Sequence, residues 1–384
     1  MKAGAVKNRD DLLVLAAGRL PQGRYGGSLA GLGAVALGRA AVEELLRDGA
    51  LPRPGSALWG MARSHTQGMN PARTLALEAG LPPETTAFTV NMACGSSLQA
   101  LIVACQRLRD GAEGAILAGG SEAMSDTPHL VPGLRWGFRI GHRQAPDVMH
   151  QDGLLCPVTG LLMGETVERL AAKRGIARTE ADAWAAESHR RAAAADFRAE
   201  HLPHPQLDRD ECIREGVREE SLAALPPVFA PGGQITAGNA SALADGAACL
   251  LVARREQAGD ARPLARILGW VEAGVDPLDM GEAPVPAVRR LLADHGLRVA
   301  DIDLWELNEA FSAQLLVCQR QLTLPPERLN VTGGGVALGH PIGASGARIA
   351  VTLIHQLRTR GGGLGVATLG IGGGLGLAVL FEVV

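Results

Sequence analysis

Apolar positions along the chain follow two spacings that alternate with each other. Short apolar runs bounded by turn residues are typical of buried strands, whereas apolar residues three and four positions apart are typical of helices. In the first part of the chain this predicts strands at residues 12–17, 86–91 and 115–118 and helices at residues 32–46 and 96–109. Gly111 lies just beyond the second helix, where a C-terminal glycine is favoured. The pattern predicts an α/β fold.

The middle of the chain breaks this alternation. Residues 121–243 are richer in His, Pro, Trp and charged side chains, and they contain helical stretches near 163–174 and 179–198. We interpret this region as an inserted lid or loop domain. A buried apolar strand returns at residues 247–253.

The alternation resumes from about residue 265. It predicts strands at 302–307 and 329–332 and helices at 310–322 and about 349–357. Both parts of the chain share a scheme of strand, polar or Gly-rich turn, then helix, which indicates two similar α/β halves. The predicted units are an N-terminal half of residues 1–120 and 244–264, a loop domain of residues 121–243 and a C-terminal half of residues 265–384.

Two apolar segments resemble membrane or targeting segments. Residues 361–381 carry no charged side chain, but the glycines at 372–374 divide them into two short strands, so we predict a buried hairpin. The run at 12–17 follows Lys2, Lys7 and Arg9 as in a signal peptide, but Asp10 and Asp11 interrupt that pattern. We therefore interpret this run as a first strand of a protein that is not secreted.

Composition sets limits on the fold and on partners. With 384 residues, 47% of them hydrophobic, the chain can bury a large core. Aromatic residues make up only 3% and glycine contributes 50 residues, so this core consists of aliphatic side chains and closely packed backbone. A net charge of −3 gives no support for binding nucleic acid or an anionic membrane, since both need clustered basic charge.

The cysteines point to free thiols. Six of them are spread along the chain without a C-x-x-C pair, and no Cys/His cluster has the spacing of a zinc site. This pattern suits the reducing cytoplasm.

Cys94 lies between a predicted strand and the N-terminus of a predicted helix, in the segment TVNMACGSSL at 89–98. Unpaired N–H groups and the positive end of a helix stabilise a thiolate, so we expect a lowered thiol pKa here. Ser96 is placed to cap the helix. A small buried cysteine explains the same segment about as well, and this pattern alone does not decide between the two.

Three further segments contain candidate catalytic groups. Residues 332–348 are rich in glycine and include His340, which is of the right type to activate a thiol. Asn308 lies at a strand-to-helix junction, where it either holds a water or an oxyanion or simply caps the helix. The glycines of residues 368–376 offer backbone N–H groups for an oxyanion hole, although close strand packing explains them too.

Taken together, these segments make the chain resemble the thiolase family over nearly its whole length. The motifs that carry the resemblance are GGSLA at 26–30, NPAR at 70–73, AGGSEAMS at 118–125, MGET at 163–166, QITAGNAS at 234–241, NEAF at 308–311 and GGGVALGHP at 333–341. The resemblance implies a five-layered αβαβα fold of two similar halves with an inserted loop domain that holds coenzyme A.

The resemblance also implies roles for individual residues. Cys94 would take the acyl group as a thioester, and His340 would accept its proton and help to bind the thioester oxygen. Asn308 would hold a water that completes this oxyanion site, and the N–H groups of Cys94 and Gly372 would form a second one. The positions that match the lining of the pantetheine channel are Met163, Phe229, Ala237, Ser241, Ala310 and Phe311. Coenzyme A would be substrate or product, with no further cofactor and no metal, and the protein would be a homodimer or homotetramer.

One position departs from the family pattern in a way that affects the chemistry. Most such thiolases read ATLCIGGG in the final loop, whereas this chain reads ATLGIGGG at 367–374, with Gly370 in place of the second cysteine. That cysteine moves the α-proton in carbon–carbon bond formation or cleavage, and glycine has no group to do so. Transfer of the acyl group to Cys94 is expected to survive, while the carbon–carbon step is impaired unless His340, a water or Cys156 substitutes.

The sequence therefore predicts an acyl-CoA C-acyltransferase that makes or cleaves 3-ketoacyl-CoA. One alternative keeps the acyl-enzyme but passes the acyl group to another acceptor or to water, or condenses it with loss of CO2. Another is a CoA-binding pseudoenzyme. An NAD-dependent oxidoreductase and a serine hydrolase are weaker alternatives, because the dinucleotide-binding arrangement and a G-x-S-x-G motif are missing.

Overall fold

The computed structural model describes residues 11–112 and 114–383. The basic residues of the signal-like segment, Lys2, Lys7 and Arg9, lie outside the described residues. The apolar run that follows them forms β1 (Leu12–Arg19), as predicted, and this strand is buried almost throughout. None of the described helices is long and apolar enough to cross a membrane.

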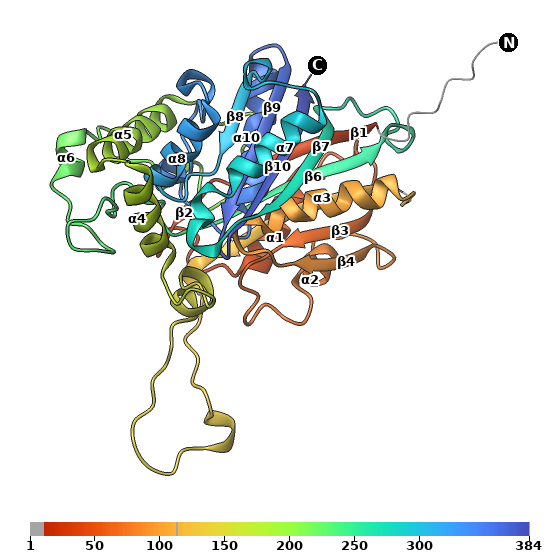
Figure 1. Ribbon diagram of the computed structural model, residues 1–384. Coiled ribbons are helices and arrows are strands. Elements are labelled where there is room, and N and C mark those ends of the chain that lie inside the picture. The colour runs from red at the N-terminus through yellow and green to blue at the C-terminus, as the bar shows by residue number, and fades with distance from the viewer. Residues whose placement is uncertain (1–10, 113, 384) are drawn as a thin grey trace.

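Among the described residues, a mixed sheet of 10 strands organises the molecule (Figure 1). Besides β1, its strands are β2 (Gly23–Arg24), β3 (Pro54–Gly60), β4 (Thr86–Val90), β5 (Ala115–Ala123), β6 (Ala244–Arg254), β7 (Ala265–Gly274), β8 (Leu304–Leu307), β9 (Gly363–Ile371) and β10 (Leu375–Val383). The strand order is β4-β3-β5-β6-β1-β7-β10-β9-β8, and β2 pairs with β6. The predicted C-terminal hairpin is formed by β9 and β10.

The helices lie between and around these strands. They are α1 (Ala34–Leu45), α2 (Pro71–Glu78), α3 (Ser96–Arg109), α4 (Met163–Arg174), α5 (Arg178–Ala194), α6 (Glu219–Ala223), α7 (Pro284–Asp294), α8 (Ser312–Leu322), α9 (Gly335–Leu338) and α10 (Ser345–Thr359). Helix α3 has the bounds that the apolar spacing predicted.

The two predicted halves repeat the same strand order. In the first half the order from the centre outward is β1, β6, β5, β3 and β4, and in the second half it is β7, β10, β9 and β8. The first two pairings are antiparallel in each half, and the next, β5 with β3 or β9 with β8, is parallel. The halves meet where β1 pairs with β7 over only three residues, Leu12–Val14.

Alternating side chains on β1 show how the layers are built, because successive residues of a strand point to opposite faces. Leu12 and Val14 join the cluster formed by α3 and α10, whereas Leu13 and Leu15 join the cluster under α1 and α2. A third cluster packs α7 and α8 on the outer face of the second half. The layers are therefore helix, sheet, helix, sheet and helix, as the resemblance implied.

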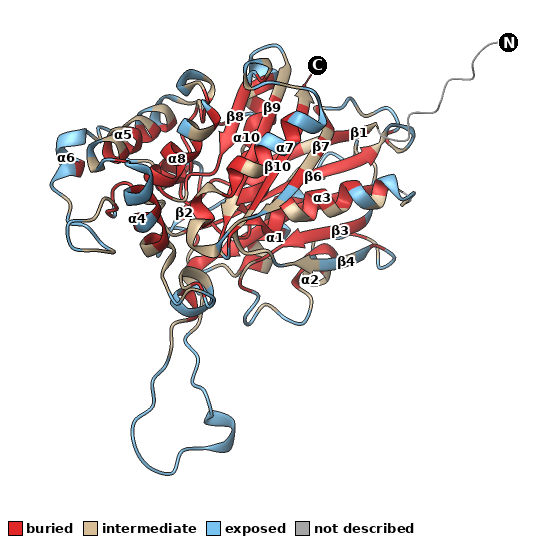
Figure 2. Ribbon diagram, in the orientation of Figure 1, coloured by how far each residue is buried: buried red, intermediate tan, exposed pale blue. Residues whose placement is uncertain are grey.

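The central helix layer is the most deeply buried part of the fold. Residues Ser345–Leu353 of α10 are all buried, and Figure 2 shows the strands beside it almost entirely in the buried colour. Because other elements cover this helix on all sides, its exposed residues begin only near its C-terminal end, at Arg358.

The predicted strand at 329–332 is wrong and has a specific cause. It stands where the second half would repeat β4, but it makes only isolated bridges, including one between Trp305 and Leu329. Asn330 has a left-handed φ of 46°, which interrupts an extended ladder. Its side chain instead accepts from the N–H of Leu307 (2.9 Å) and donates to the same residue's carbonyl (2.8 Å).

Two helix boundaries also differ from the prediction. Helix α5 ends at Ala194 because the chain turns extended at Ala195, and Phe197 then packs its ring under the guanidinium of Arg19 at 4.9 Å. Helix α8 begins at Ser312, because Phe311 is extended and pairs with Ala240.

The inserted region includes a long segment that leaves the body of the molecule. Between η2 (Met124–Asp126) and η4 (His150–Leu154) the chain extends away from the sheet, as the yellow ribbon of Figure 1 shows. Apolar side chains are exposed on it, including Trp136 at 87% and Ile140 at 90% (Figure 2).

Replacing Gly346 by alanine tests the close approach of α3 and α10. A β-carbon at Gly346 would lie 2.6 Å from the backbone nitrogen of Leu98, so the helices must move apart. Although alanine favours a helix over glycine, we expect Gly346→Ala to lower the free energy of unfolding by about 1–3 kcal/mol, measured by urea denaturation. Gly31→Ala, which meets no atom within 4 Å, is the control. A stabilised Gly346→Ala variant would contradict this packing.

Candidate active site

Cys94 lies in a short turn between β4 and α3. The turn is the 3₁₀ segment η1 (Ala93–Gly95), and Ala93 has a φ of 45°, which is strained for a residue with a β-carbon. Ser96 stabilises it, since its Oγ accepts from the N–H of Met92 (2.9 Å) and donates to the carbonyl of Ala93 (2.6 Å). Ser96 thus fixes the turn that presents Cys94, two residues before the helix begins.

The expectation of a lowered Cys94 pKa is wrong in sign. Burial raises the pKa of the thiol and outweighs the opposing effects of the Gly372 N–H group and the Arg63 guanidinium. The N-terminus of α3 therefore does not generate a thiolate by itself, and at neutral pH the group is a thiol. Its use as a nucleophile requires a base.

His340 has the features of that base. It is buried in the turn after α9, and its Nδ1 lies 2.5 Å from the Oγ of Ser345. Because this hydroxyl donates its hydrogen to the carbonyl of Pro341 (2.9 Å), it must accept from Nδ1–H, which leaves the lone pair on Nε2. Nε2 is buried and has no hydrogen-bond partner among the described residues.

The electrostatics keep this imidazole neutral. Burial, together with the guanidinium groups of Arg348 and Arg63, lowers the pKa of His340 to about 3. At neutral pH an uncharged, partly buried thiol and a neutral imidazole are therefore present, with a free lone pair on the imidazole. Such a pair reacts by moving the thiol proton as the nucleophile attacks.

Asn308 follows β8 and has a fixed amide orientation. Arg348 donates to its Oδ1 at 3.3 Å, and Arg348 is itself paired with Glu306 at 3.2 Å, all of them buried. The amide nitrogen consequently points the other way and is buried without a partner among the described residues. Burial raises the pKa of Glu306 to about 8 despite the neighbouring Arg348.

The β9–β10 turn closes over Cys94. The side chain of Ile371 fills the space where a side chain of Gly95 would be, and the N–H of Gly372 reaches the Cys94 sulfur. A β-carbon on Gly372 would lie 3.1 Å from the sulfur of Met163. The turn thus lies between Cys94 and the start of α4.

The central helix layer brings these groups to one place. The Oγ of Ser97 accepts from the N–H of Ala347 (2.8 Å), which joins the N-terminal ends of α3 and α10. Ile342, two residues from His340, packs in one cluster with Cys94 and Leu154. The structure therefore gathers Cys94, Gly372 and the His340 turn, and Arg348 connects Asn308 to them.

Most of the predicted channel residues also gather. Met163, Phe229 and Ala310 pack on the cluster that contains Phe311, and the rings of Phe229 and Phe311 meet edge to face at 6.2 Å. The N–H of Ser241 donates to the carbonyl of Ala310 (3.0 Å). Ala237 differs from this group in being exposed.

Gly370 lies on β9 with little free space beside it. A β-carbon there would lie 3.0 Å from the carbonyl oxygen of Met280 and 3.4 Å from Cδ of Pro284. A side chain at this position is accommodated only if the segment at the start of α7 gives way by a few tenths of an ångström.

Two residues of this site were not found from the sequence. Ser345, which sets the His340 tautomer, carries no signal beyond its place in the Gly-rich segment. Arg63 is buried, and its charge acts to lower the pKa values of both Cys94 and His340. In the sequence, its position shortly after an apolar run was the only signal that pointed to it.

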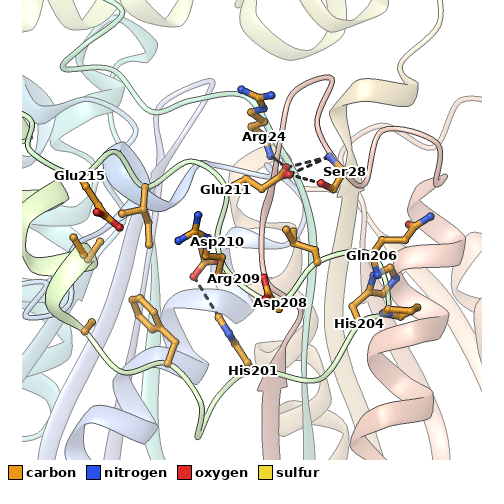
Figure 3. Close-up of a pocket in the computed structure, with 17 residues that line it drawn as sticks. Arg24, Ser28, His201, His204, Gln206, Asp208, Arg209, Asp210, Glu211 and Glu215 are labelled. Carbon is orange, nitrogen blue, oxygen red and sulfur yellow. Dashed lines mark hydrogen bonds and ion pairs between the residues drawn. The ribbon is translucent and has the colours of Figure 1, made fainter.

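A large cavity lies elsewhere, between the end of α5 and the segment that follows it (Figure 3). It has a volume of about 900 Å³ and a mixed lining in which His201 faces Asp210 and Ser28 bonds to Glu211. None of the predicted site residues lines it. In the described part of the chain, His, Cys, Asp and Glu side chains form no group of three that is placed to hold a metal ion.

Comparisons with known proteins identify relatives over nearly the whole length of the chain. The family described as thiolase, N-terminal domain, matches residues 12–256, and thiolase, C-terminal domain, matches residues 261–383. An acetyl-CoA acetyltransferase of Chromobacterium violaceum is 43% identical, over 97% of this chain and 99% of the relative. An acetyl-CoA acetyltransferase of Pseudomonas aeruginosa is 44% identical, over 96% and 98%.

Solved structures give the same result. The crystal structure of human mitochondrial 3-ketoacyl-CoA thiolase superposes with a TM-score of 0.95 and 38% identity, over 98% of this chain and 99% of that one. The same human enzyme in complex with CoA superposes with a TM-score of 0.94 and 38% identity, over 98% of both chains.

Alkylation of Cys94 tests its protonation state. Because the thiolate is the reactive form and burial raises the pKa of this thiol, we expect iodoacetamide labelling to rise only above the ordinary value of 9.0. No shoulder is expected near pH 6–7, since His340 stays neutral down to about pH 3. Peptide mass mapping gives the rate, and Cys94→Ser gives the background. Full reactivity already at pH 7 would refute the neutral pair.

Proposed function

The chain belongs to the thiolase family and is an acyl-CoA C-acyltransferase, and we propose that it works through an acyl thioester on Cys94. The observation that carries this proposal is the free lone pair on the buried Nε2 of His340, two residues from Ile342, which packs in one cluster with the Cys94 thiol that needs a base. Coenzyme A is its substrate and product, as the CoA complexes of related structures suggest.

The first half-reaction follows from these groups. Nε2 of His340 takes the proton of Cys94 as the sulfur attacks the thioester carbonyl of the acyl-CoA. The imidazolium then donates Nε2–H to the oxyanion, together with a water held by the amide nitrogen of Asn308. When the tetrahedral intermediate collapses, the CoA thiolate leaves and recovers the proton from His340, so the products are acyl-Cys94 and CoA.

The second oxyanion site consists of backbone groups. In this proposal the N–H groups of Cys94 and Gly372 bind the oxygen of the acyl-enzyme thioester while the second substrate reacts. The contact of the Gly372 N–H with the Cys94 sulfur supports this role. Donors held by rigid backbone need no rearrangement when charge develops.

The loop region provides the coenzyme A site in this scheme. Residues 121–243 form the inserted domain, between the N-terminal half of residues 1–120 and 244–264 and the C-terminal half of residues 265–384. The pantetheine arm passes Met163, Phe229, Ala237, Ser241, Ala310 and Phe311. The edge-to-face pair of Phe229 and Phe311 supports an apolar wall there.

The carbon–carbon step needs a second acid/base, and Gly370 does not provide one. We propose that Cys156 takes this role. Although burial opposes it, hydrogen bonds from Thr159, Val158 and Gly373 lower the pKa of the Cys156 thiol. The N–H of Gly372 donates to the sulfur of Cys94, and the N–H of the next residue, Gly373, donates to the sulfur of Cys156. In condensation Cys156 would take the α-proton of the second acyl-CoA, and in cleavage it would return it.

We further propose a homodimer or homotetramer that resides in the cytoplasm. Free cysteines among the described residues suit a reducing compartment. The exposed Trp136 and Ile140 on the extended segment favour contact with another copy of the chain.

Mass spectrometry after mixing with acetyl-CoA tests the acyl-enzyme. The expected product carries one acetyl group on Cys94, and Cys94→Ala forms none. His340→Asn should slow acetylation by about 10²–10⁴-fold, since a positioned general base is removed. Cys249→Ala, a change deep in the outer core of the first half, controls for general damage. If the wild-type protein binds CoA esters but stays unmodified, Cys94 is not the acyl carrier.

The replacement acid/base is tested by thiolysis of acetoacetyl-CoA. We expect Cys156→Ala to slow thiolysis by about 10²–10⁴-fold while acetylation of Cys94 by acetyl-CoA keeps its wild-type rate. Adding Gly370→Cys to this variant should recover part of the activity, limited by the contact with Met280. Thiolysis by Cys156→Ala at the wild-type rate would exclude Cys156 from this role.

A further inference from the structure

Arg63 is a buried cation without a hydrogen-bonding partner. Its side chain is only 4% exposed, and none of its three nitrogens donates a hydrogen bond to any described residue. The nearest opposite charge is Glu122, at 3.9 Å from NH1, which is beyond hydrogen-bond distance. Burying N–H donors without hydrogen-bond acceptors is unfavourable, and a distant counter-ion does not satisfy them, so such a group indicates an acceptor that arrives with a ligand.

Glu122 makes no hydrogen bond to the Arg63 guanidinium because its oxygens already accept from backbone N–H groups. Its carboxylate accepts from the N–H groups of Ala62 (3.1 Å), Arg63 (3.1 Å) and Gly343 (2.9 Å). These bonds hold the carboxylate toward the main chain on either side of the site. The guanidinium therefore keeps all five of its N–H donors available.

The position of the guanidinium places it beside the acyl-carrying cysteine. It occupies the space where a side chain of Gly153 would be, and the contact between Nε2 of His65 and Oδ2 of Asp152 (3.3 Å) joins the same two segments. The neighbours in sequence, Ala62 and Leu154, both pack in the cluster that contains Cys94. Adjacent residues lie about 3.8 Å apart, so Arg63 borders the space around the sulfur.

The electrostatic effects agree with this location. The guanidinium opposes the rise in the pKa of Cys94 and lowers the pKa of His340. Besides Arg63 and Glu122, the space around Cys94 is bordered by apolar side chains: Met124, Met149, Ile342, Leu154 and Leu243. A guanidinium with free donors beside an apolar wall favours a ligand that is mostly hydrocarbon with one anionic end.

We propose that Arg63 binds a carboxylate on the acyl group, so that the enzyme acts on acyl-CoAs whose acyl chain ends in a carboxylate. The planar guanidinium matches a carboxylate with two parallel hydrogen bonds. This inference rests on the proposed acyl-enzyme. In the cleavage direction, CoA and a 3-ketoacyl-CoA with a terminal carboxylate would give acetyl-CoA and a shorter carboxyacyl-CoA. The terminal carboxylate is unchanged.

Acylation of Cys94 by two matched thioesters tests the proposal. Succinyl-CoA and 4-methylpentanoyl-CoA have the same branched outline, but only the first carries a charge. We expect the wild-type protein to be acylated by succinyl-CoA at least about tenfold faster at limiting concentration, measured by mass spectrometry. Arg63→Leu should reverse this preference, Arg63→Lys should keep part of it, and Arg53→Leu, an exposed arginine, should leave it intact.

A second arm identifies which carboxylate is bound. Malonyl-CoA also carries one, and its use would release CO2. If the wild-type protein prefers succinyl-CoA and Arg63→Leu loses this preference, the site holds the end of the acyl chain. If only malonyl-CoA decarboxylation depends on Arg63, a carboxylate site exists but the proposed substrate class is wrong.

Other outcomes separate this inference from the proposed function. Acetyl-CoA labelling of Cys94 with equal use of the two matched thioesters by the wild-type protein would retain the acyl-enzyme and refute the role of Arg63. Absence of labelling by any thioester would refute both. The wild-type comparison decides the matter even if Arg63→Leu fails to fold.

Discussion

The active site depends on how closely the N-terminal ends of α3 and α10 approach each other. Gly346 leaves room for the backbone of Leu98, and the hydroxyl of Ser97 accepts from the N–H of Ala347. One helix follows Cys94 and the other follows His340, so this contact sets the relative positions of the proposed nucleophile and base. Cys94 and His340 lie on opposite sides of β7 in the chain order, so the proposed site needs both parts of the fold, which meet where β1 pairs with β7.

Burial then decides the electrostatics of the site. It raises the pKa of Cys94 and lowers the pKa of His340 to about 3, so both groups are uncharged at rest. A resting thiolate–imidazolium pair would need solvation that this interior lacks. In the proposed reaction charge is created only when substrate arrives, and the Asn308 amide, which Arg348 orients, would help to bind it.

The sequence predicted the repeated α/β scheme, helix α3 and the segments around Cys94, Asn308, His340 and Gly372, because these depend on local spacing and motif. It missed β3, which begins with proline and glycine and so looks like a loop.

The sign of the Cys94 pKa shift and the burial of Arg63 could not be predicted from the sequence either. Both arise from contacts between segments far apart in the chain, and the residue type alone does not show whether an arginine is buried or solvated.

The two halves end in different ways, and this affects how the sheet can grow. β4 is an outermost strand with partly exposed residues and a partner on one side only. At the opposite end Asn330 takes the place of a fifth strand, and Arg191 of α5 donates to the carbonyl groups of Leu329 and Asn330. Because those carbonyl groups already accept hydrogen bonds, any edge-to-edge pairing of this sheet is expected at β4 and not at the opposite end.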